Sequence, residues 1–135
     1  MLLKEKFVLF PLGRKRFALP AGRVHELARP GDLHSFPHTT ALLGGVLVRR
    51  GRMLPVCDVA AALVPAERVG RKCYLIAARG GEWTAIPVSG ECELIEAQMI
   101  PPTGRLPEHV TGLLSLPEEI FEVLELDRIA AEVSA

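Results

Sequence analysis

The sequence carries no net charge at neutral pH, because its 16 lysine and arginine residues are matched by 16 aspartate and glutamate residues. A balanced chain lacks the positive field that draws proteins onto nucleic acids or acidic membrane surfaces. Aromatic residues are also scarce, with five phenylalanines, one tryptophan and one tyrosine. A surface that stacks bases needs exposed aromatics beside a basic stripe. We therefore expect no binding to nucleic acid.

Cysteines are few, and no segment is suited to secretion or membrane insertion. The three cysteines are Cys57, Cys73 and Cys92. Their odd number and wide spacing favour reduced thiols over a secreted disulfide framework. The start, MLLKEKFVLF, has charges within its apolar run and no cleavage site, so no signal peptide is expected. The longest uncharged stretch, Leu33 to Val48, contains Pro37 and several polar residues and is unsuited to spanning a membrane. These absences predict a soluble cytoplasmic protein.

Residue patterns for catalysis or metal binding are also missing. The sequence has no C-x-x-C pair and no G-x-G-x-x-G loop. Pro37 lies between His34 and His38 and disfavours a helix with both on one face, so a solvated loop is favoured over a zinc site. His25 and His109 have no adjacent serine or cysteine to activate. We expect no enzyme activity, no cofactor and no metal.

Two stretches of the sequence share one hairpin pattern. KFVLFPLGRKRFALP predicts strands from Phe7 to Leu12 and from Phe17 to Leu19, joined by a turn at Gly13 to Arg16. RKCYLIAARGGEWTAIP repeats this plan, with its turn at Arg79 to Glu82. The similarity between the two stretches indicates that part of the chain is duplicated.

One offset aligns the two halves of the chain. The step from Ala18 to Ala85 is 67 residues, and it also aligns Phe7 with Tyr74, Val8 with Leu75, Leu9 with Ile76, Gly13 with Gly80 and Leu27 with Leu94. Farther along, Gly45 matches Gly112 and, after a small insertion, Asp58 matches Asp127. A period this long favours two similar β lobes over a solenoid. We expect a single domain with approximate lobes 1–65 and 68–135, between which strands can be exchanged.

Each half ends with an aspartate before an alanine-rich stretch. Asp58 and Asp127 have the side-chain oxygen that an N-cap needs to accept a bond from the first helical turn. Pro65 would end the first helix after Val64. Capping is favoured over a catalytic carboxylate pair, and we expect a short helix after each lobe.

A third hairpin carries a cluster of positive charge. Apolar runs from Val46 to Val48 and from Met53 to Cys57 flank Arg50 and Gly51, which places these two at the tip. Glycine readily supplies the positive φ angle that such a turn requires. The arginines would therefore be exposed on a rigid β scaffold.

The same stretch, GVLVRRGRMLPVCDV, resembles the central motif of the CheW-type chemotaxis coupling proteins. The matching positions are Gly45, Arg50, Gly51, Pro55 and Asp58. The resemblance extends over almost the whole chain, including F-A-L-P in the first hairpin, V-H-E-L at 24–27 and the final D-R-I-A-A. It implies an all-β fold of two SH3-like five-stranded barrels packed side by side, in agreement with the duplication.

The resemblance also implies a function. Proteins of this family couple methyl-accepting chemotaxis receptors to a CheA-type histidine kinase, whose regulatory domain has the same fold. We therefore expect a non-enzymatic scaffold that binds the cytoplasmic tip of a receptor and the kinase regulatory domain. The alternative is a small β-barrel module that binds an unrelated peptide or nucleic acid.

Four residues match positions that the family uses for receptor binding: Val24, Glu26, Gly45 and Arg50. Kinase contacts are not assigned by the resemblance. Glu26 could instead pair with Arg50 inside the protein. The chain departs from the family pattern just before the arginine-glycine pair, where it has Val48 and Arg49 in place of a polar and then an apolar residue.

Overall fold

A computed structural model describes residues 4–29, 33–34, 43–66, 73–101 and 104–129. The described chain is almost entirely β-structure, in keeping with the predicted fold class. Its first half contains β1 (Glu5–Leu12), β2 (Lys15–Pro20), the 3-10 turn η1 (Ala21–Arg23), β3 (Val24–Ala28), β4 (Leu33–His34), β5 (Leu43–Arg49), β6 (Arg52–Cys57) and α1 (Val59–Leu63). Its second half contains β7 (Cys73–Arg79), β8 (Glu82–Val88), β9 (Glu93–Ala97), β10 (Met99–Ile100), β11 (Val110–Leu116), β12 (Glu119–Leu124) and the 3-10 turn η2 (Leu126–Arg128).

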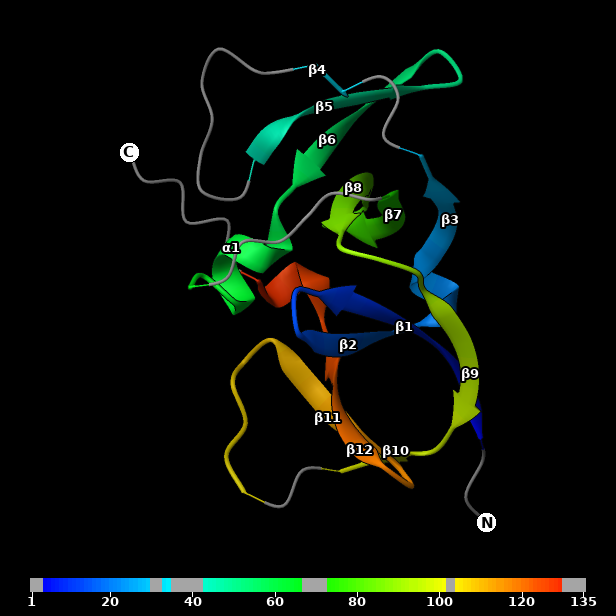
Figure 1. Cartoon of the computed structure of the whole chain (residues 1–135), viewed down its shortest axis with the longest axis vertical. Helices are drawn as coiled ribbons and strands as arrows, with labels where there is room; N and C mark the ends of the chain where they lie inside the picture. Colours follow the sequence, from blue (N-terminus) through cyan, green and yellow to red (C-terminus); the bar gives the residue numbers. More distant parts are fainter. Residues whose placement is uncertain (1–3, 30–32, 35–42, 67–72, 102–103, 130–135) are drawn as a thin grey trace.

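The strands form two six-stranded sheets, each built from both halves of the sequence. The lower sheet in Figure 1 has the order β10-β11-β12-β2-β1-β9, and the upper sheet has the order β3-β7-β8-β6-β5-β4. Each sheet therefore takes one hairpin from one half and four strands from the other. Adding six to strand numbers up to six and subtracting six from the others converts the upper order into the lower order read in reverse, as a duplication requires.

Each sheet curls toward closure. In the lower sheet the two end strands, β9 and β10, are separated in sequence by Gln98 alone. Counted as one bent strand, they make a five-stranded barrel closed by the chain itself, which is the strand number predicted from the resemblance. The end strands of the upper sheet, β3 and β4, are likewise consecutive in the sequence.

The strand register confirms the duplication. A parallel contact pairs Val56 with Ala85 in the upper sheet, and the residues 67 positions away, Val123 and Ala18, pair in the lower sheet. Irregular pairing occurs next to Gly45 in β5 and, equivalently, next to Gly112 in β11. A Cβ atom on Gly112 would lie 2.7 Å from Cγ of Met99 in β10, so a side chain at this position would have to displace the side chain of Met99.

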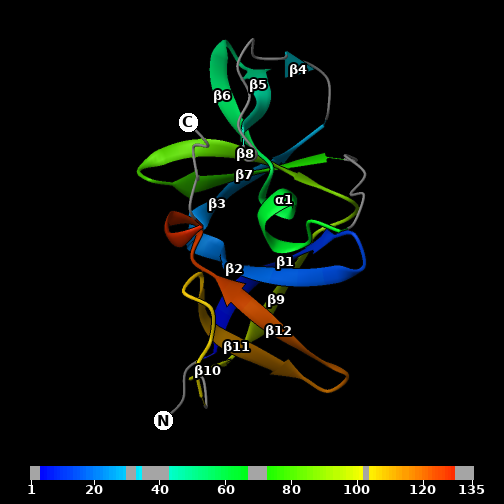
Figure 2. The same ribbon diagram turned by 90° about the vertical axis from the view of Figure 1, so that its left-hand side faces the viewer.

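A shared core joins the two sheets. Phe10 and Phe17 of the lower sheet and Leu75 and Ile86 of the upper sheet belong to one buried cluster, which also includes Val59 of α1. The two views place α1 between the sheets (Figures 1 and 2). Each barrel has its own smaller cluster as well. The hairpins β1–β2 and β7–β8 are therefore covered on both faces, which explains their nearly continuous apolar runs.

The helical segments require a correction to the predicted caps. Asp58 stands at the N-cap position of α1, as predicted, and this helix ends at Leu63, one residue before the predicted Val64 and ahead of Pro65. However, the side chain of Asp58 makes no capping hydrogen bond to this helix. Glu125, not Asp127, caps η2 by accepting a bond from the backbone of Asp127. Asp58 and Glu125 lie 67 positions apart in the sequence, the same offset as the other matched pairs. The small insertion assumed when Asp58 was aligned with Asp127 is therefore not needed.

Among the described residues, no helix has the length and apolar character needed to cross a membrane.

Candidate functional site

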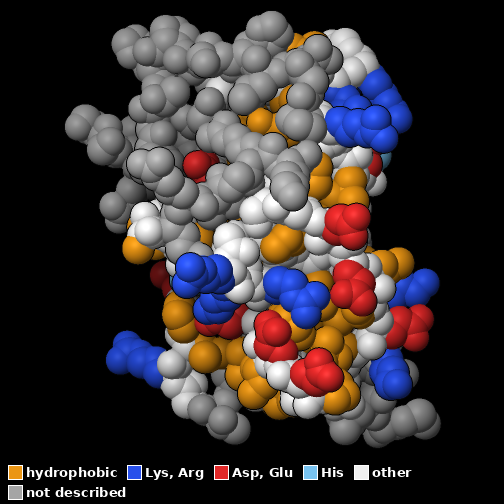
Figure 3. Space-filling view, viewed as in Figure 1, with side chains coloured by type: hydrophobic (Ala, Val, Ile, Leu, Met, Phe, Trp, Pro, Cys, Tyr) orange, Lys and Arg blue, Asp and Glu red, His pale blue; other side chains and the backbone are white. Residues whose placement is uncertain are grey.

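The turn between β5 and β6 presents three arginines. Arg50 and Gly51 have φ angles of 51° and 75°, the combination that a two-residue type I′ hairpin requires. Among the described residues, Arg50 is the only non-glycine with a positive φ. Arg49 and Arg52 pair across the base of the turn. The predicted hairpin tip is confirmed, and Figure 3 shows a basic cluster at its upper right, where this turn lies.

Glu26 of β3 faces this turn and pairs chiefly with Arg49. Nε of Arg49 donates to Oε1 of Glu26 at 2.7 Å, and its second donor, NH2, reaches Oε2 at 3.2 Å. The guanidinium of Arg50 lies farther away, with its NH2 at 3.7 Å from Oε2. Strands β3 and β5 lie well apart in the sheet order. The contact therefore results from the curling of the sheet.

The Glu26–Arg49 pair is held in its ionised form. The hydrogen bond from Arg49 lowers the pKa of Glu26, against a smaller opposing effect of burial, and the charges of Arg49 and Arg50 lower it further. The same hydrogen bond raises the pKa of Arg49. Forked bonds between guanidinium and carboxylate fix the relative orientation of the two groups. Arg49 therefore holds this carboxylate most closely, and the pairing of Glu26 with Arg50 that the sequence offered as an alternative is also present, at 3.7 Å.

Arg50 is consequently the more available cation. Its side chain is 73% exposed, whereas the side chain of Arg49 is 30% exposed. A guanidinium at a turn, beside apolar side chains, can donate forked hydrogen bonds to a carboxylate of another molecule.

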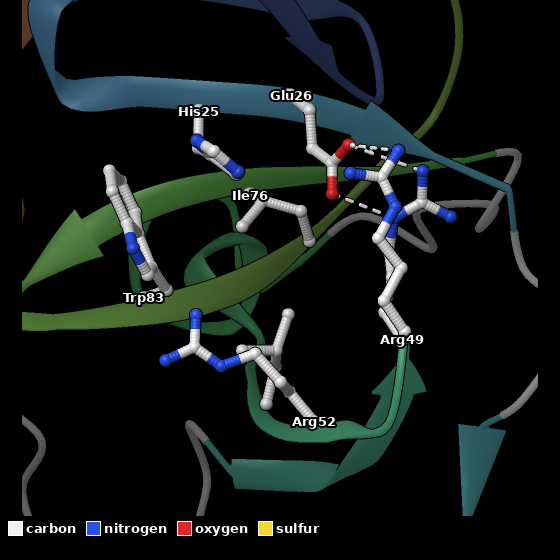
Figure 4. Close-up of a pocket in the computed structure, with 8 residues that line it drawn as sticks. His25, Glu26, Arg49, Arg52, Ile76 and Trp83 are labelled. Atoms are coloured by element: carbon white, nitrogen blue, oxygen red, sulfur yellow. Dashed lines mark hydrogen bonds and ion pairs between the residues drawn. The ribbon is translucent and has the colours of Figure 1, made fainter.

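Together these groups line a pocket of about 140 Å³, which we call the basic groove. Its lining consists of His25, Glu26, Arg49, Arg50, Arg52, Leu54, Ile76 and Trp83. The His25 and Trp83 rings are 4.8 Å apart between centroids, tilted by 33°. Figure 4 shows His25 and Trp83 on one side of the groove and the forked ion pair on the other. The groove combines cations with apolar surface, so it suits an acidic side chain next to an apolar one.

The four predicted site residues are not all in this groove. Glu26 and Arg50 line it together. Val24, at the start of β3, is partly buried and packs against the core cluster between the sheets. Gly45 is buried in β5 with a φ of 146°, at the irregular pairing that bends the strand. The last two are therefore placed to support the groove and do not line it.

Several groove residues were not predicted from the sequence. Arg49 was identified only as a departure from the family pattern, and His25, Arg52 and Trp83 were not assigned to any partner site. Arg52 could have been found from the turn, because a two-residue turn at 50–51 pairs position 52 with position 49. Trp83 comes from a distant strand, and no local signal in the sequence connects it with His25.

Among the residues that the structure describes, the remaining chemical candidates do not form a catalytic or metal site. Cys57, Cys73 and Cys92 are free thiols, as predicted, and Cys57 is fully buried in an apolar cluster. His38 lies outside the described residues. Across the described ranges, no three potential metal ligands gather in one place.

Comparisons with known proteins agree on one family. Residues 6–134 match the family model described as the CheW-like domain. Protein FrzA of Myxococcus xanthus is 29% identical over 136 residues, which covers 93% of this chain and 85% of that protein. The probable chemotaxis protein CheW of Rhizobium etli is 22% identical over 140 residues, covering 97% and 90%.

A solved structure has the same fold. The scaffolding protein TtCheW of Thermoanaerobacter tengcongensis superimposes with a TM-score of 0.83 at 20% identity, covering 94% of this chain and 92% of that one. The predicted architecture of two β lobes is therefore confirmed.

Proposed function

We propose, from the premise that this chain belongs to the CheW-like domain family, that it is a non-enzymatic scaffold of chemotaxis signal transduction. More specifically, it couples the cytoplasmic tip of a methyl-accepting receptor to the regulatory domain of a CheA-type histidine kinase. The observation that carries this proposal is the family match over residues 6–134. Both proposed partners act at the cytoplasmic face of the membrane, so the scaffold works in the cytoplasm.

The basic groove is the proposed receptor site. Arg50 is exposed at the end of a rigid turn, and the partly buried side chains of Leu54 and Trp83 supply apolar surface beside it. A receptor segment with an acidic side chain next to an apolar one would satisfy both features. Buried apolar contacts with a charge-assisted hydrogen bond at their edge are typical of residues that dominate protein interfaces.

In this proposal, Val24 and Gly45 affect receptor binding indirectly, by positioning the basic groove. Val24 anchors β3 to the core between the sheets, and β3 carries Glu26. Gly45 permits the backbone irregularity that precedes the arginine turn in β5. Substitutions at these two positions would misplace the groove without removing a contact.

Coupling in this proposal requires no reaction. The two sheets share one buried cluster, and each contains strands from both halves of the chain. A body built in this way holds two partner surfaces in fixed relative positions. Movement of a receptor bound at one surface would then be passed to a kinase bound at another through differential contacts.

Reconstitution tests the proposal. The purified chain is mixed with a receptor cytoplasmic fragment and a kinase regulatory domain from the source organism, and complexes are separated by size-exclusion chromatography. We expect binary complexes with each partner and a ternary complex that requires the chain. With the full-length kinase and receptor fragment, autophosphorylation should rise only when the chain is present.

The same preparation tests the alternative of nucleic-acid binding. Single-stranded DNA and RNA oligonucleotides, followed by fluorescence anisotropy at about 0.1 M salt, should show no binding. Binding to oligonucleotides with no complex to either protein would refute the coupling proposal.

A further inference from the structure

Two of the three cysteines lie where the chain passes from one sheet to the other. Cys73 is the first residue of β7 in the upper sheet, and Cys92 directly precedes β9 of the lower sheet. The connection from β8 to β9, residues 89–92, runs from the upper sheet down to the lower one (Figure 1). Both side chains are partly buried and pack against the core cluster that the sheets share. The pair therefore spans the two sheets.

Hydrogen bonds hold this connection in place. The backbone N–H and the hydroxyl of Ser89 both donate to the carbonyl of Pro11 in β1, each at 3.1 Å. The thiol of Cys73 donates to the carbonyl of Gly90, with Sγ 3.6 Å from the oxygen. Cys73 therefore contacts the connection two residues before Cys92.

The two thiols also affect each other's ionisation. Burial raises the pKa of both, and it raises that of Cys92 to about 12, where the charge of Cys73 and a hydrogen bond to it add to the shift. In Cys73 the effect of burial on the pKa is opposed by a hydrogen bond from the Cys92 thiol. A hydrogen bond requires the two sulfur atoms to be in contact. Cys73 is the more readily ionised member of the pair.

We propose that Cys73 and Cys92 form a redox modification site, at which a low-molecular-weight disulfide, represented by oxidised glutathione, converts the pair into an intramolecular disulfide. The Cys73 thiolate attacks one sulfur of oxidised glutathione, which breaks its S–S bond, forms a mixed disulfide and releases one glutathione thiolate. Cys92 then loses its proton to solvent, attacks the Cys73 sulfur and releases the second glutathione thiolate. The two protein thiols lose two electrons and two protons, and oxidised glutathione becomes two molecules of reduced glutathione.

The first step prepares the second. In the mixed disulfide Cys73 carries no charge, so it no longer opposes the ionisation of Cys92. The structure with both thiols free is the reduced form of the site. The disulfide ties β7 of the upper sheet to β9 of the lower sheet, beside the connection that already joins them. Cytoplasmic disulfides of this kind are transient and respond to oxidants.

Peptide mapping tests the proposal, using this chain alone. The protein is equilibrated with mixtures of reduced and oxidised glutathione, quenched with acid, denatured, alkylated and digested with trypsin. Trypsin separates the three cysteines, which fall in the peptides 53–68, 73–79 and 80–105. We expect the last two peptides to be recovered joined as the share of oxidised glutathione rises, and to separate on reduction. Cys57, which is fully buried, should stay a free thiol and serves as the internal control.

Serine variants separate the two steps. Cys92→Ser keeps the attacking thiol without the resolving one, so it should accumulate the mixed disulfide of glutathione with Cys73. Cys73→Ser should react with glutathione at least about tenfold more slowly, because the remaining thiol is the less readily ionised one. Circular dichroism establishes that both variants are folded. Oxidation of the unmodified protein should raise its melting temperature by about 5 °C or more, a shift that neither variant shows.

Two results would overturn the proposal. One is recovery of the peptides 73–79 and 80–105 unlinked at a large excess of oxidised glutathione. The other is a disulfide that includes Cys57, because it would require the core to open. Receptor–kinase coupling is unaffected by either result, because neither partner is present.

Discussion

The backbone N–H of Gly80 donates a hydrogen bond of 2.6 Å to Oδ1 of Asp127. This bond joins the turn of the β7–β8 hairpin to η2 at the end of the described chain. The neighbouring Arg79 supports the same junction by donating to the carbonyl of Ile129 at 2.8 Å. Asp127 therefore stabilises a distant turn, which differs from the capping role predicted for it.

Asp127→Ala should lower the free energy of unfolding by about 0.5–2 kcal/mol, because it removes a charge-assisted hydrogen bond at a partly exposed site. Urea denaturation measures the change. Glu108→Ala, at an exposed position, serves as the control and should stay within about 0.5 kcal/mol of the unmodified protein. Equal effects of the two substitutions would mean that the bond to Gly80 contributes nothing.

The ion pair between Glu26 and Arg49 predicts a pH dependence. The folded-state pKa of Glu26 lies below its ordinary value of 4.5, because Arg49 hydrogen-bonds its carboxylate. A depressed carboxyl pKa contributes stability that is present above the unfolded value and is lost as pH falls through the folded value. The stability difference between the unmodified protein and Glu26→Gln should therefore be largest near neutral pH and shrink below pH 4.5. Denaturant titrations across this range measure the difference, and a constant difference would contradict the assignment.

Local features of the sequence predict the hairpins well and the pairing between distant strands poorly. The turns at Gly13 and Gly80 are recognisable because glycine and charged residues interrupt apolar runs. The parallel contact of Val56 with Ala85 joins strands from different halves, and no local sequence pattern predicts it. The duplication shows which strands are equivalent, but not which half supplies each sheet.

In the candidate site, too, local features were predictable from the sequence and contacts between distant strands were not. The arginine turn was predicted from its own sequence, whereas the partner of Glu26 depended on how the sheet curls. Matching by residue type also gave a wrong alignment of the two halves. Asp58 was aligned with the other aspartate, Asp127, whereas its equivalent at the N-cap position is Glu125. The uniform offset of 67 residues was the better guide.

The interleaved sheets predict that the two halves of the chain do not fold independently. In the part of the chain that the structure describes, residues 1–66 supply two strands of the lower sheet, and residues 67–135 supply two strands of the upper sheet. Each fragment also lacks part of the core cluster that joins the sheets. Expressed separately, the fragments should show no near-ultraviolet circular dichroism and no cooperative melting, while the whole chain unfolds in one transition. Cooperative melting of either fragment would show two independent domains.

Burial predicts low reactivity for one thiol. Burial raises the pKa of Cys92 to about 12, and the adjacent Cys73 adds to the shift. Because the thiolate is the reactive form, alkylation of Cys92 at pH 8 should be roughly a hundredfold to a thousandfold slower in the folded protein than in urea. Mass spectrometry of iodoacetamide-treated samples measures both rates. Comparable rates would show that this thiol is not buried.

Arg50 and Val24 should respond differently to substitution, because one is exposed and the other packs against the core. Arg50→Glu reverses a charge at a turn without opening a cavity, so the melting temperature should be preserved. Receptor binding should fall by roughly tenfold to a few hundredfold, as expected when about 1.5–3 kcal/mol of charge-assisted hydrogen bonding is lost. Kinase binding should be much less affected, since the kinase is expected to dock elsewhere. Val24→Asp places a charge against the core cluster and should lower the melting temperature as well as receptor binding.

Titrations of each purified variant against the receptor fragment and the kinase regulatory domain separate these effects. The control is Arg105→Glu, which makes the same charge change at an exposed position outside the basic groove. It should bind both partners normally, so any loss specific to Arg50→Glu reflects position and not net charge. Trp83, the single tryptophan, lines the groove, so its fluorescence should change when the receptor fragment binds. Equal weakening toward both partners, or full receptor affinity in Arg50→Glu, would show that the arginine turn is not the receptor contact.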